Sequence, residues 1–310
     1  MSEQTSSKDI NFKDFKSGFI TFVGRPNAGK STLINALVKQ KVAITSNMPQ
    51  TTRHLLRAVL TTNNMQAIFI DTPGIHKPID TLGKKLNDST YLGLSEIDIV
   101  VMIIDVTKPI GKGDKLIINR IKNIKAKKFC IFTKIELSNN DEFQSQKNKA
   151  CQLLDWDEIV FVSAFKNTNI DNLLNCFYEN LSWGHPWYDK DTICDQTDEV
   201  IISEIIREKA ILNLKEEVPH SVGVEIDSVE WKDKTDLLKI YATIYIETPS
   251  QKKILIGRGG RVIKKIGIES RIDIEGYFKK KVYLDLSVKI KKHWRKDINQ
   301  IIRFGYGNEI

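Results

Sequence analysis

Residues 24–31 have the types and spacing of a phosphate-binding loop. Their sequence, GRPNAGKS, matches the pattern G-x-x-x-x-G-K-[ST] at every fixed position. Glycine lets backbone N–H groups curl around a phosphate at a helix N-terminus, while Lys30 neutralises β- and γ-phosphate oxygens and the Ser31 hydroxyl can ligate Mg²⁺. The residues expected at the phosphates are Gly24, Arg25, Pro26, Asn27, Ala28, Gly29, Lys30, Ser31 and Thr32.

Two later segments could complete this site. Residues 71–74 (DTPG) follow the predicted strand Met65–Ile70, where the Asp71 carboxylate can hold a metal-bound water and the Gly74 N–H can reach the γ-phosphate. A threonine of the segment 50–53 (QTTR) can close over Mg²⁺ only when the γ-phosphate is present, which gives an order–disorder switch. The predicted metal ligands are Ser31, Thr52 and Asp71. The predicted catalytic groups are Lys30, Thr52 and Gly74.

A purine base could bind after the next strands. Residues 133–136 (TKIE) follow the predicted strand Phe129–Phe132, and Ser163-Ala164 follows Ile159–Val162. A carboxylate that accepts both guanine N1–H and N2–H rejects adenine, which lacks that donor pair. The Lys134 stem can pack flat on the purine, and a backbone N–H can meet the guanine oxygen. The residues added to the predicted nucleotide site are Asp71, Thr72, Pro73, Gly74, Ile75, Thr133, Lys134, Ile135, Glu136, Ser163 and Ala164.

These five motifs together resemble those of the Era family of GTPases. The resemblance implies slow, Mg²⁺-dependent hydrolysis of GTP to GDP. Ile75 stands where other GTPases use glutamine to orient water, so help from an ion or a partner is expected. Asn27 resembles an asparagine that places K⁺ near the phosphates in related enzymes. A simple turn role for Asn27 is equally open. The chain departs from the family's Asn-Lys-x-Asp at Thr133 and Glu136. Threonine can brace the loop by hydrogen bonds, but the longer glutamate must retract, which is expected to weaken guanine binding.

A second set of candidates lies in a basic segment near the C-terminus. Between Gln251 and Arg303 there are sixteen Lys and Arg against five Asp and Glu, whereas the whole chain has a net charge of +8. Such a block suits nucleic acid or an anionic membrane, and on charge alone a solvated lysine-rich face is equally open. An isolated G-x-x-G is more often a helix–helix turn, but here the basic neighbours favour a loop that clamps a nucleic-acid backbone. The predicted RNA-binding residues are Lys252, Lys253, Gly257, Arg258, Gly259, Gly260, Arg261, Lys264 and Lys265.

Alternating strand and helix patterns must position these residues. They predict an α/β fold: a P-loop GTPase with a mixed, mostly parallel sheet, in which Leu55–Thr62 and Met65–Ile70 form one antiparallel pair. The order helix, strand, strand, helix, helix, strand, helix that follows resembles a type II KH domain, of the α+β class. The expected divisions are a flexible segment 1–16, a GTPase domain 17–182, a linker 183–199 and a KH domain 200–310. Linker residues Trp183, Trp187 and Tyr188 are expected to dock one domain on the other.

Composition excludes several classes of protein. Hydrophobic residues make up 41% of the 310 residues and charged residues 28%, which is neither disordered nor fibrous composition. The longest apolar run, Ile99–Ile104, is too short for a membrane span, and the polar N-terminus disfavours a secretory signal. The four cysteines are far apart without a CxxC motif, which favours reduced thiols in the cytoplasm.

The family resemblance also implies partners. It implies binding near the 3′ end of small-subunit ribosomal RNA and a role in assembling the small ribosomal subunit. We expect a monomer, with a peripheral contact at the inner face of the cell membrane left open. The alternative is a constitutive RNA-binding protein whose nucleotide domain binds but barely hydrolyses GTP. A P-loop kinase is disfavoured, because it needs neither the threonine–DxxG pair nor a basic second domain.

Overall fold

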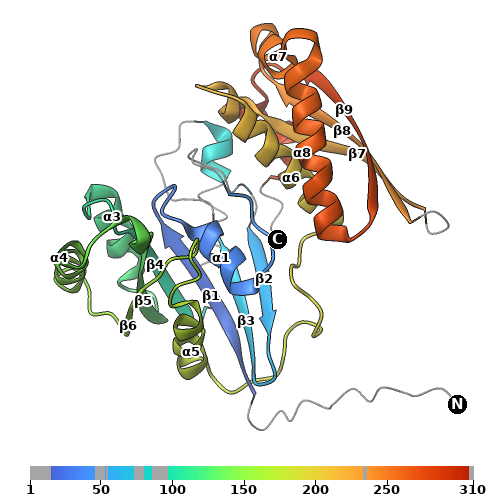
Figure 1. Cartoon of the computed structure of the whole chain (residues 1–310). Coiled ribbons are helices and arrows are strands. Elements are labelled where there is room, and N and C mark those ends of the chain that lie inside the picture. Colours follow the sequence, from blue (N-terminus) through green and yellow to red (C-terminus); the bar gives the residue numbers. More distant parts are fainter. Residues whose placement is uncertain are drawn as a thin grey trace, which may run out of the picture.

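Two sheets, each with its own helices, follow one another along the chain (Figure 1). The computed structural model describes residues 15–45, 53, 55–72, 80–85, 97–232 and 236–306. We call the part with the first sheet the first domain and the part with the second sheet the second domain.

The sheet of the first domain has six strands in the order β2-β3-β1-β4-β5-β6. Strand β2 is antiparallel to β3, and every other neighbouring pair is parallel, as the sequence patterns predict. Strands β3 and β4 are buried at every residue, which explains their continuous apolar runs. The strands are β1 (Lys16–Gly24), β2 (Leu56–Thr61), β3 (Met65–Asp71), β4 (Ile99–Asp105), β5 (Lys127–Thr133) and β6 (Glu158–Phe161).

Helices cover both faces of this sheet. One core contains Leu33 and Leu37 of α1 with Phe177 of α5, and the other contains Ile117 of α3 with Ala150 of α4. No helix among the described residues is long and apolar enough to cross a bilayer. The helices are α1 (Lys30–Val38), α3 (Lys112–Ile121), α4 (Asn140–Cys151) and α5 (Ile170–Asn180), with a 3₁₀ turn η2 (Ile135–Leu137) and a helical stretch at 81–85.

The second domain has a three-stranded sheet in the order β7-β8-β9, with β7 antiparallel and β9 parallel to β8. Its strands are β7 (Gly223–Lys232), β8 (Leu237–Ile246) and β9 (Lys281–Ile290). Its helical elements are α6 (Asp198–Asn213), η3 (Val218–Ser221), α7 (Pro249–Ile256), η5 (Arg258–Gly260), α8 (Arg261–Phe278), η6 (Trp294–Lys296) and α9 (Ile298–Arg303).

The end of the second domain differs from the predicted order, which has a single helix after the last strand. Asp297 lies between η6 and α9, and its side chain accepts a hydrogen bond from the Asn299 N–H. This cap starts a new helix and lets Trp294 turn inward, where it is fully buried. The indole N–H donates to the Ser221 carbonyl at 2.8 Å.

The linker follows the free edge of β2. The Val59 N–H donates to the Ile193 carbonyl at 2.8 Å, and the backbones of Cys194 and Ala58 form an isolated antiparallel β-bridge. The prediction that linker rings dock one domain on the other is wrong. Trp187 packs on Phe19, and Trp183 lies near the Lys16 ammonium, so both rings contact the first domain. The Tyr188 backbone bonds to the Gln66 side chain, also in the first domain.

Candidate nucleotide site and nucleic-acid interface

The carboxyl ends of five strands bring the predicted nucleotide motifs to one edge of the sheet. Strand β1 lies between β3 and β4, so the strand order reverses there. In open α/β sheets, ligands bind outside the carboxyl ends at such a switch point. Gly24, Asp71, Asp105 and Thr133 are the last residues of β1, β3, β4 and β5, and Ser163 follows β6.

The phosphate loop has a backbone suited to anion binding. Gly29 has a φ of 98°, a left-handed conformation that favours glycine, and Lys30 begins α1 directly after it. Lys30 is 7% exposed, and burial lowers its pKa even though the nearby Asp71 carboxylate raises it. A buried cation at a helix N-terminus is matched to a phosphate group.

The structure brings together two of the three predicted metal ligands. The Ser31 hydroxyl donates to Asp71 Oδ2 at 2.6 Å. A hydroxyl and a carboxylate at this separation fit Mg²⁺, which takes oxygen ligands. The third, Thr52, lies outside the described residues, as do Pro73, Gly74 and Ile75.

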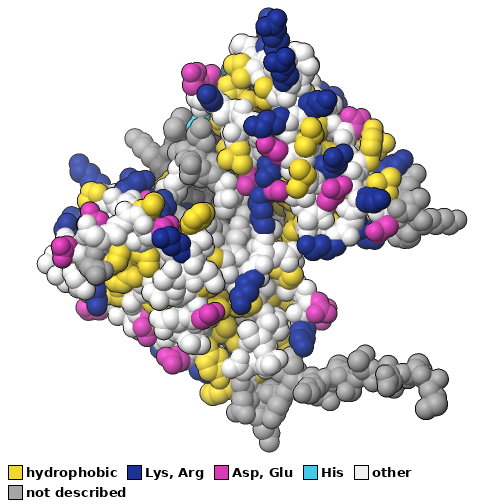
Figure 2. Space-filling view, viewed as in Figure 1, with side chains coloured by type: hydrophobic (Ala, Val, Ile, Leu, Met, Phe, Trp, Pro, Cys, Tyr) yellow, Lys and Arg dark blue, Asp and Glu magenta, His cyan; other side chains and the backbone are white. Residues whose placement is uncertain are grey.

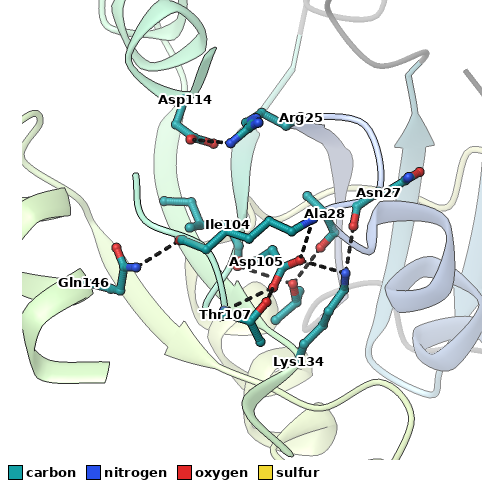
Figure 3. A network of polar contacts seen from close by, with 11 residues as sticks. Arg25, Asn27, Ala28, Ile104, Asp105, Thr107, Asp114, Lys134 and Gln146 are labelled. Carbon is teal, nitrogen blue, oxygen red and sulfur yellow. Dashed lines mark hydrogen bonds and ion pairs between the residues drawn. The ribbon is translucent and has the colours of Figure 1, made fainter. Parts of the chain in front are cut away.

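Other side chains of the predicted nucleotide site are directed elsewhere. The Arg25 guanidinium lies 3.5 Å from the Asp114 carboxylate on α3, so its side chain extends away from the loop (Figure 3). Asn27 has a φ of 63°, which asparagine tolerates better than most residues and which fits the turn role. The Thr72 hydroxyl donates to the Phe22 carbonyl at 2.8 Å and is buried. Thr32 is exposed on the first turn of α1.

Thr133 links the phosphate loop to residues 133–136, the segment predicted to bind the base, which we call the base motif. Its hydroxyl donates to the Ala28 carbonyl at 2.6 Å and lies 3.3 Å from the Ile104 carbonyl. Thr133 is 2% exposed, so this bond is shielded from water. The hydrogen-bonding role that sequence analysis gave to threonine at this position is therefore present.

Lys134 is held by Asp105, which sequence analysis did not include in the site (Figure 3). Lys134 Nζ donates to Asp105 Oδ2 at 2.8 Å and to the Asn27 carbonyl at 2.9 Å. The only signal for Asp105 in the sequence is that it ends the apolar run Ile99–Ile104. A carboxylate at a strand end is common, and its partner lies twenty-nine positions away in the chain.

One carboxylate oxygen of Glu136, Oε2, is a buried hydrogen-bond acceptor without a donor among the described residues. An unsatisfied buried acceptor is costly, and guanine N–H donors would satisfy it. This atom fits the predicted base site. At the next motif, the Ser163 N–H already donates to the Thr168 carbonyl at 3.2 Å, which leaves Ala164 as the better donor to a base.

The glycine loop of the second domain is open. Gly257, Gly259 and Gly260 all have positive φ, and an added Cβ at Gly259 or Gly260 would meet no heavy atom within 4 Å. Backbone of this kind lets another chain approach closely. In Figure 2, Lys and Arg side chains gather over the second domain, in the region of α7 and α8 in Figure 1. The exposed predicted residues are Lys253, Arg258, Gly259, Arg261, Lys264 and Lys265.

A groove of about 1100 Å³ continues along α8 and β9 beside the predicted RNA-binding residues. Ile263, Gly267, Leu284 and Leu286 give it an apolar floor. Basic side chains stand along it, and of these the sequence analysis had named only Lys264. Two signals in the sequence could have added the others: the run of lysines at 279–281, and the alternation of apolar and polar residues along β9. The basic lining residues are Lys264, Arg271, Lys279, Lys280 and Lys281.

Arg53, at the end of the predicted switch segment, reaches into the second domain. Its guanidinium donates to the Val222 carbonyl at 2.6 Å and to the His220 carbonyl at 3.1 Å. It also lies 5.5 Å from the Trp294 ring centroid and 5.3 Å from that of Tyr306. Arg53 is 2% exposed, so the first domain buries a charge inside the second.

The residues after the DTPG motif contact the same part of the second domain. Leu82 is buried in one cluster with the rings of Tyr245, Trp294, Phe304 and Tyr306. We call this the C-terminal aromatic cluster. Asp80 lies 3.5 Å from the Arg295 guanidinium. Arg53 of the predicted switch segment and Leu82, which follows the DTPG motif at a distance, therefore meet one aromatic cluster.

A third contact joins the domains just after the end of α1. Lys41 Nζ lies 2.8 Å from Glu208 on α6 and 2.6 Å from Asp273 on α8. The pKa of Glu208 is raised because burial outweighs Lys41, whereas hydrogen bonds from Lys209 and Lys41 overcome burial and lower the pKa of Asp273. At neutral pH Asp273 is ionised, so the contact joins the Lys41 ammonium to a carboxylate across the domain boundary.

This geometry defines a P-loop GTPase followed by a KH domain. Residues 19–134 match the family of 50S ribosome-binding GTPases, and residues 217–295 match the KH domain. A variant of Era from Aquifex aeolicus, bound to GDP·AlF₄⁻, has 33% sequence identity and a TM-score of 0.91 over 94% of this chain and 99% of that chain. Era in complex with MgGDPNP and nucleotides 1506–1542 of 16S ribosomal RNA has 33% identity, a TM-score of 0.90 and the same coverage. The chain belongs to the Era family of GTPases.

Proposed function

We propose that this GTPase binds small-subunit ribosomal RNA near its 3′ end through the KH domain, under control of the bound nucleotide, and acts in small-subunit assembly. The observation that carries the control is the contact of Arg53, in the predicted switch segment, with the Trp294 and Tyr306 rings of the C-terminal aromatic cluster. The choice of RNA follows from Era crystallised with a fragment of 16S ribosomal RNA. We assign the domains to residues 17–182 and 200–310, with 183–199 as linker.

At the nucleotide edge, Lys30 would bind the β- and γ-phosphates, and Ser31 and Asp71 would hold Mg²⁺, which supplies charge stabilisation for phosphoryl transfer. Thr52 and Gly74 would complete the site around the γ-phosphate. Lys134 would pack on guanine, Glu136 would accept its N1–H and N2–H, and Ala164 would donate to its oxygen. The orphaned acceptor of Glu136 supports a ligand that donates N–H groups, as guanine does.

We propose that hydrolysis is slow. Ile75 cannot orient a water molecule by hydrogen bonding, so K⁺ near Asn27 or a bound RNA would supply the missing help. Single-turnover hydrolysis of GTP, measured with K⁺ or Na⁺ and with or without a 3′-terminal fragment of 16S ribosomal RNA, tests this. We expect measurable turnover that rises with K⁺, with RNA or with both. No turnover under any of these conditions, with GTP still bound, would support the constitutive RNA-binding alternative.

The coupling itself is tested by RNA affinity. Linkage requires RNA to change GTP affinity by the same factor that GTP changes RNA affinity. We expect affinities with GDP and with a non-hydrolysable GTP analogue to differ about 5- to 150-fold, the usual range of such coupling. Equal affinities would contradict nucleotide control and leave only a constitutive RNA clamp.

The protein is expected to act as a monomer in the cytoplasm, with any contact at the inner face of the cell membrane peripheral. Sedimentation of the purified protein, with and without anionic vesicles, tests both points. A dimer in solution would contradict the monomer. Cosedimentation that disappears at high salt would support a peripheral, electrostatic contact.

A further inference from the structure

We propose that Asp105 is a positioning residue for the guanine site: its carboxylate holds Lys134 across the phosphate loop before nucleotide binds. The side chain that packs on the purine would then be ordered in advance, and its entropy cost would not fall on binding. The inference rests on the GTP binding proposed above. It assigns a function to β4, the one strand of the nucleotide edge whose end carries none of the predicted motifs.

The two oxygens of Asp105 have separate partners (Figure 3). Oδ1 accepts from the Thr107 N–H at 3.1 Å and from the Thr107 hydroxyl at 2.6 Å, which fixes the turn after β4. Oδ2 accepts from Lys134 Nζ at 2.8 Å and lies 3.6 Å from Lys108 Nζ. One oxygen therefore shapes the local turn, and the other faces the base site.

The pair is shielded on one side and open on the other. The Asp105 side chain is 6% exposed and that of Lys134 is 31% exposed, so the carboxylate is fixed while the lysine stem remains accessible to a ligand. Burial raises the pKa of Asp105, but hydrogen bonds from Lys134 and Thr107 outweigh it and leave the pKa below its ordinary value. Asp105 is thus ionised at neutral pH.

The Lys134 backbone also needs support. Its φ of 62° lies in the left-handed region, which costs a non-glycine residue free energy and persists only where surrounding contacts impose it. Asp105 and the Asn27 carbonyl hold the far end of the side chain, while Thr133 ties the preceding residue to Ala28. The turn after Asp105 is fixed from α4, where Gln146 Nε2 donates to the Lys108 carbonyl at 2.9 Å. These contacts place Asp105 at the junction of β4, the phosphate loop and the base motif.

Asp105→Asn separates the two roles. Asparagine can keep Oδ1 toward Thr107, but it turns an N–H toward Lys134 Nζ in place of an acceptor. We expect GDP and a GTP analogue to lose about tenfold in affinity alike, because the base is common to both. IDP, which lacks the guanine amino group, should lose the same factor, since the lysine stem packs on any purine.

Lys134→Met provides the partner variant, because it keeps an apolar stem and removes the ammonium. In that background, Asp105→Asn should change GDP affinity less than about twofold, as expected when one interaction has already been removed. Thr107→Val is the matched control, because it removes the hydroxyl bond to Oδ1 and leaves the Lys134 pair. It should lower the unfolding temperature of the nucleotide-free protein and leave GDP affinity nearly unchanged.

The outcomes separate cleanly. If Thr107→Val weakens GDP as much as Asp105→Asn does, or if the effects of Asp105→Asn and Lys134→Met simply add, Asp105 only shapes its turn and the inference is wrong. If Asp105→Asn fails to fold, Lys134→Met still tests the inference, because it removes the ammonium that pairs with Asp105. An unchanged GDP affinity of Lys134→Met would then overturn the inference. Natural protein that does not bind GDP would refute the proposed function itself, and this inference with it.

Discussion

Lys30, Asp71 and Thr133 at the nucleotide edge are buried and held by neighbouring groups of the site, whereas Lys253, Arg258 and Lys264 around the KH loop are exposed. Both regions are suited to phosphate, yet the first fixes each polar group through its neighbours and the second offers charge on an open surface. The first can select one ligand by geometry. The second must depend on the sum of several screened contacts. Single substitutions should therefore act very differently in the two regions.

The sharpest test of a preorganised nucleotide edge is Lys30→Ala. It removes the buried cation beside Asp71 and should weaken GTP by about 100-fold or more, since charge-assisted contacts to phosphate are the strong ones. Isothermal titration with Mg²⁺·GTP measures this. Arg25→Ala is the matched control, because that side chain pairs with Asp114, and it should change affinity only slightly. Full GTP affinity in Lys30→Ala would refute the phosphate site.

The open KH surface should need a larger change. Arg258→Asp with Gly259→Asp reverses one charge and crowds the backbone approach, so RNA binding should be lost while GTP binding remains. Lys112→Asp with Lys115→Asp, on the exposed start of α3, controls for general loss of charge. RNA affinity of the natural protein should fall as salt rises. In a plot of the logarithm of the affinity against the logarithm of the salt concentration, each phosphate contact should contribute about −0.7 to the slope. Retained RNA binding in the first double variant would refute the clamp.

Arg53→Ala tests whether the two regions communicate. Losing the bonds to Val222 and His220 should free the second domain from the switch segment, so RNA affinity would become the same with GDP and with a GTP analogue. Arg57→Ala is the control, because Arg57 pairs with Asp195 of the linker and lies 41% exposed. Nucleotide control that survives Arg53→Ala unchanged would show that coupling runs by another route, such as the Lys41 contacts.

The nucleotide edge was largely predictable because its residues recur at fixed spacings directly after apolar strands. Parallel strands then bring those residues to one edge without further information. Asp105 and Arg53 could not be assigned in this way, because their roles depend on partners far away in the chain. The linker rings were misassigned for a related reason: an aromatic residue indicates packing but not against which surface. The KH loop was predicted from its G-x-x-G spacing, its basic neighbours and the order of the surrounding elements, whereas the groove lining depended on the packing of α8 against β9.

The smallest expected effect concerns Glu136, whose position in the nucleotide edge is fixed but whose side chain is one methylene longer than aspartate. Its Oε2 is buried but has no partner among the described residues, so it is ready for a guanine donor, and the extra methylene relative to aspartate forces the carboxylate to retract. Glu136→Asp should therefore tighten GTP several-fold, well below the few kcal/mol of a complete bidentate contact. ATP is the control ligand, because it lacks the N1–H and N2–H pair and should bind both forms equally weakly. Competition titrations with GTP and ATP measure this. Equal affinity of the natural protein for GTP and ATP, or weaker GTP binding in Glu136→Asp, would show that Glu136 does not read the base.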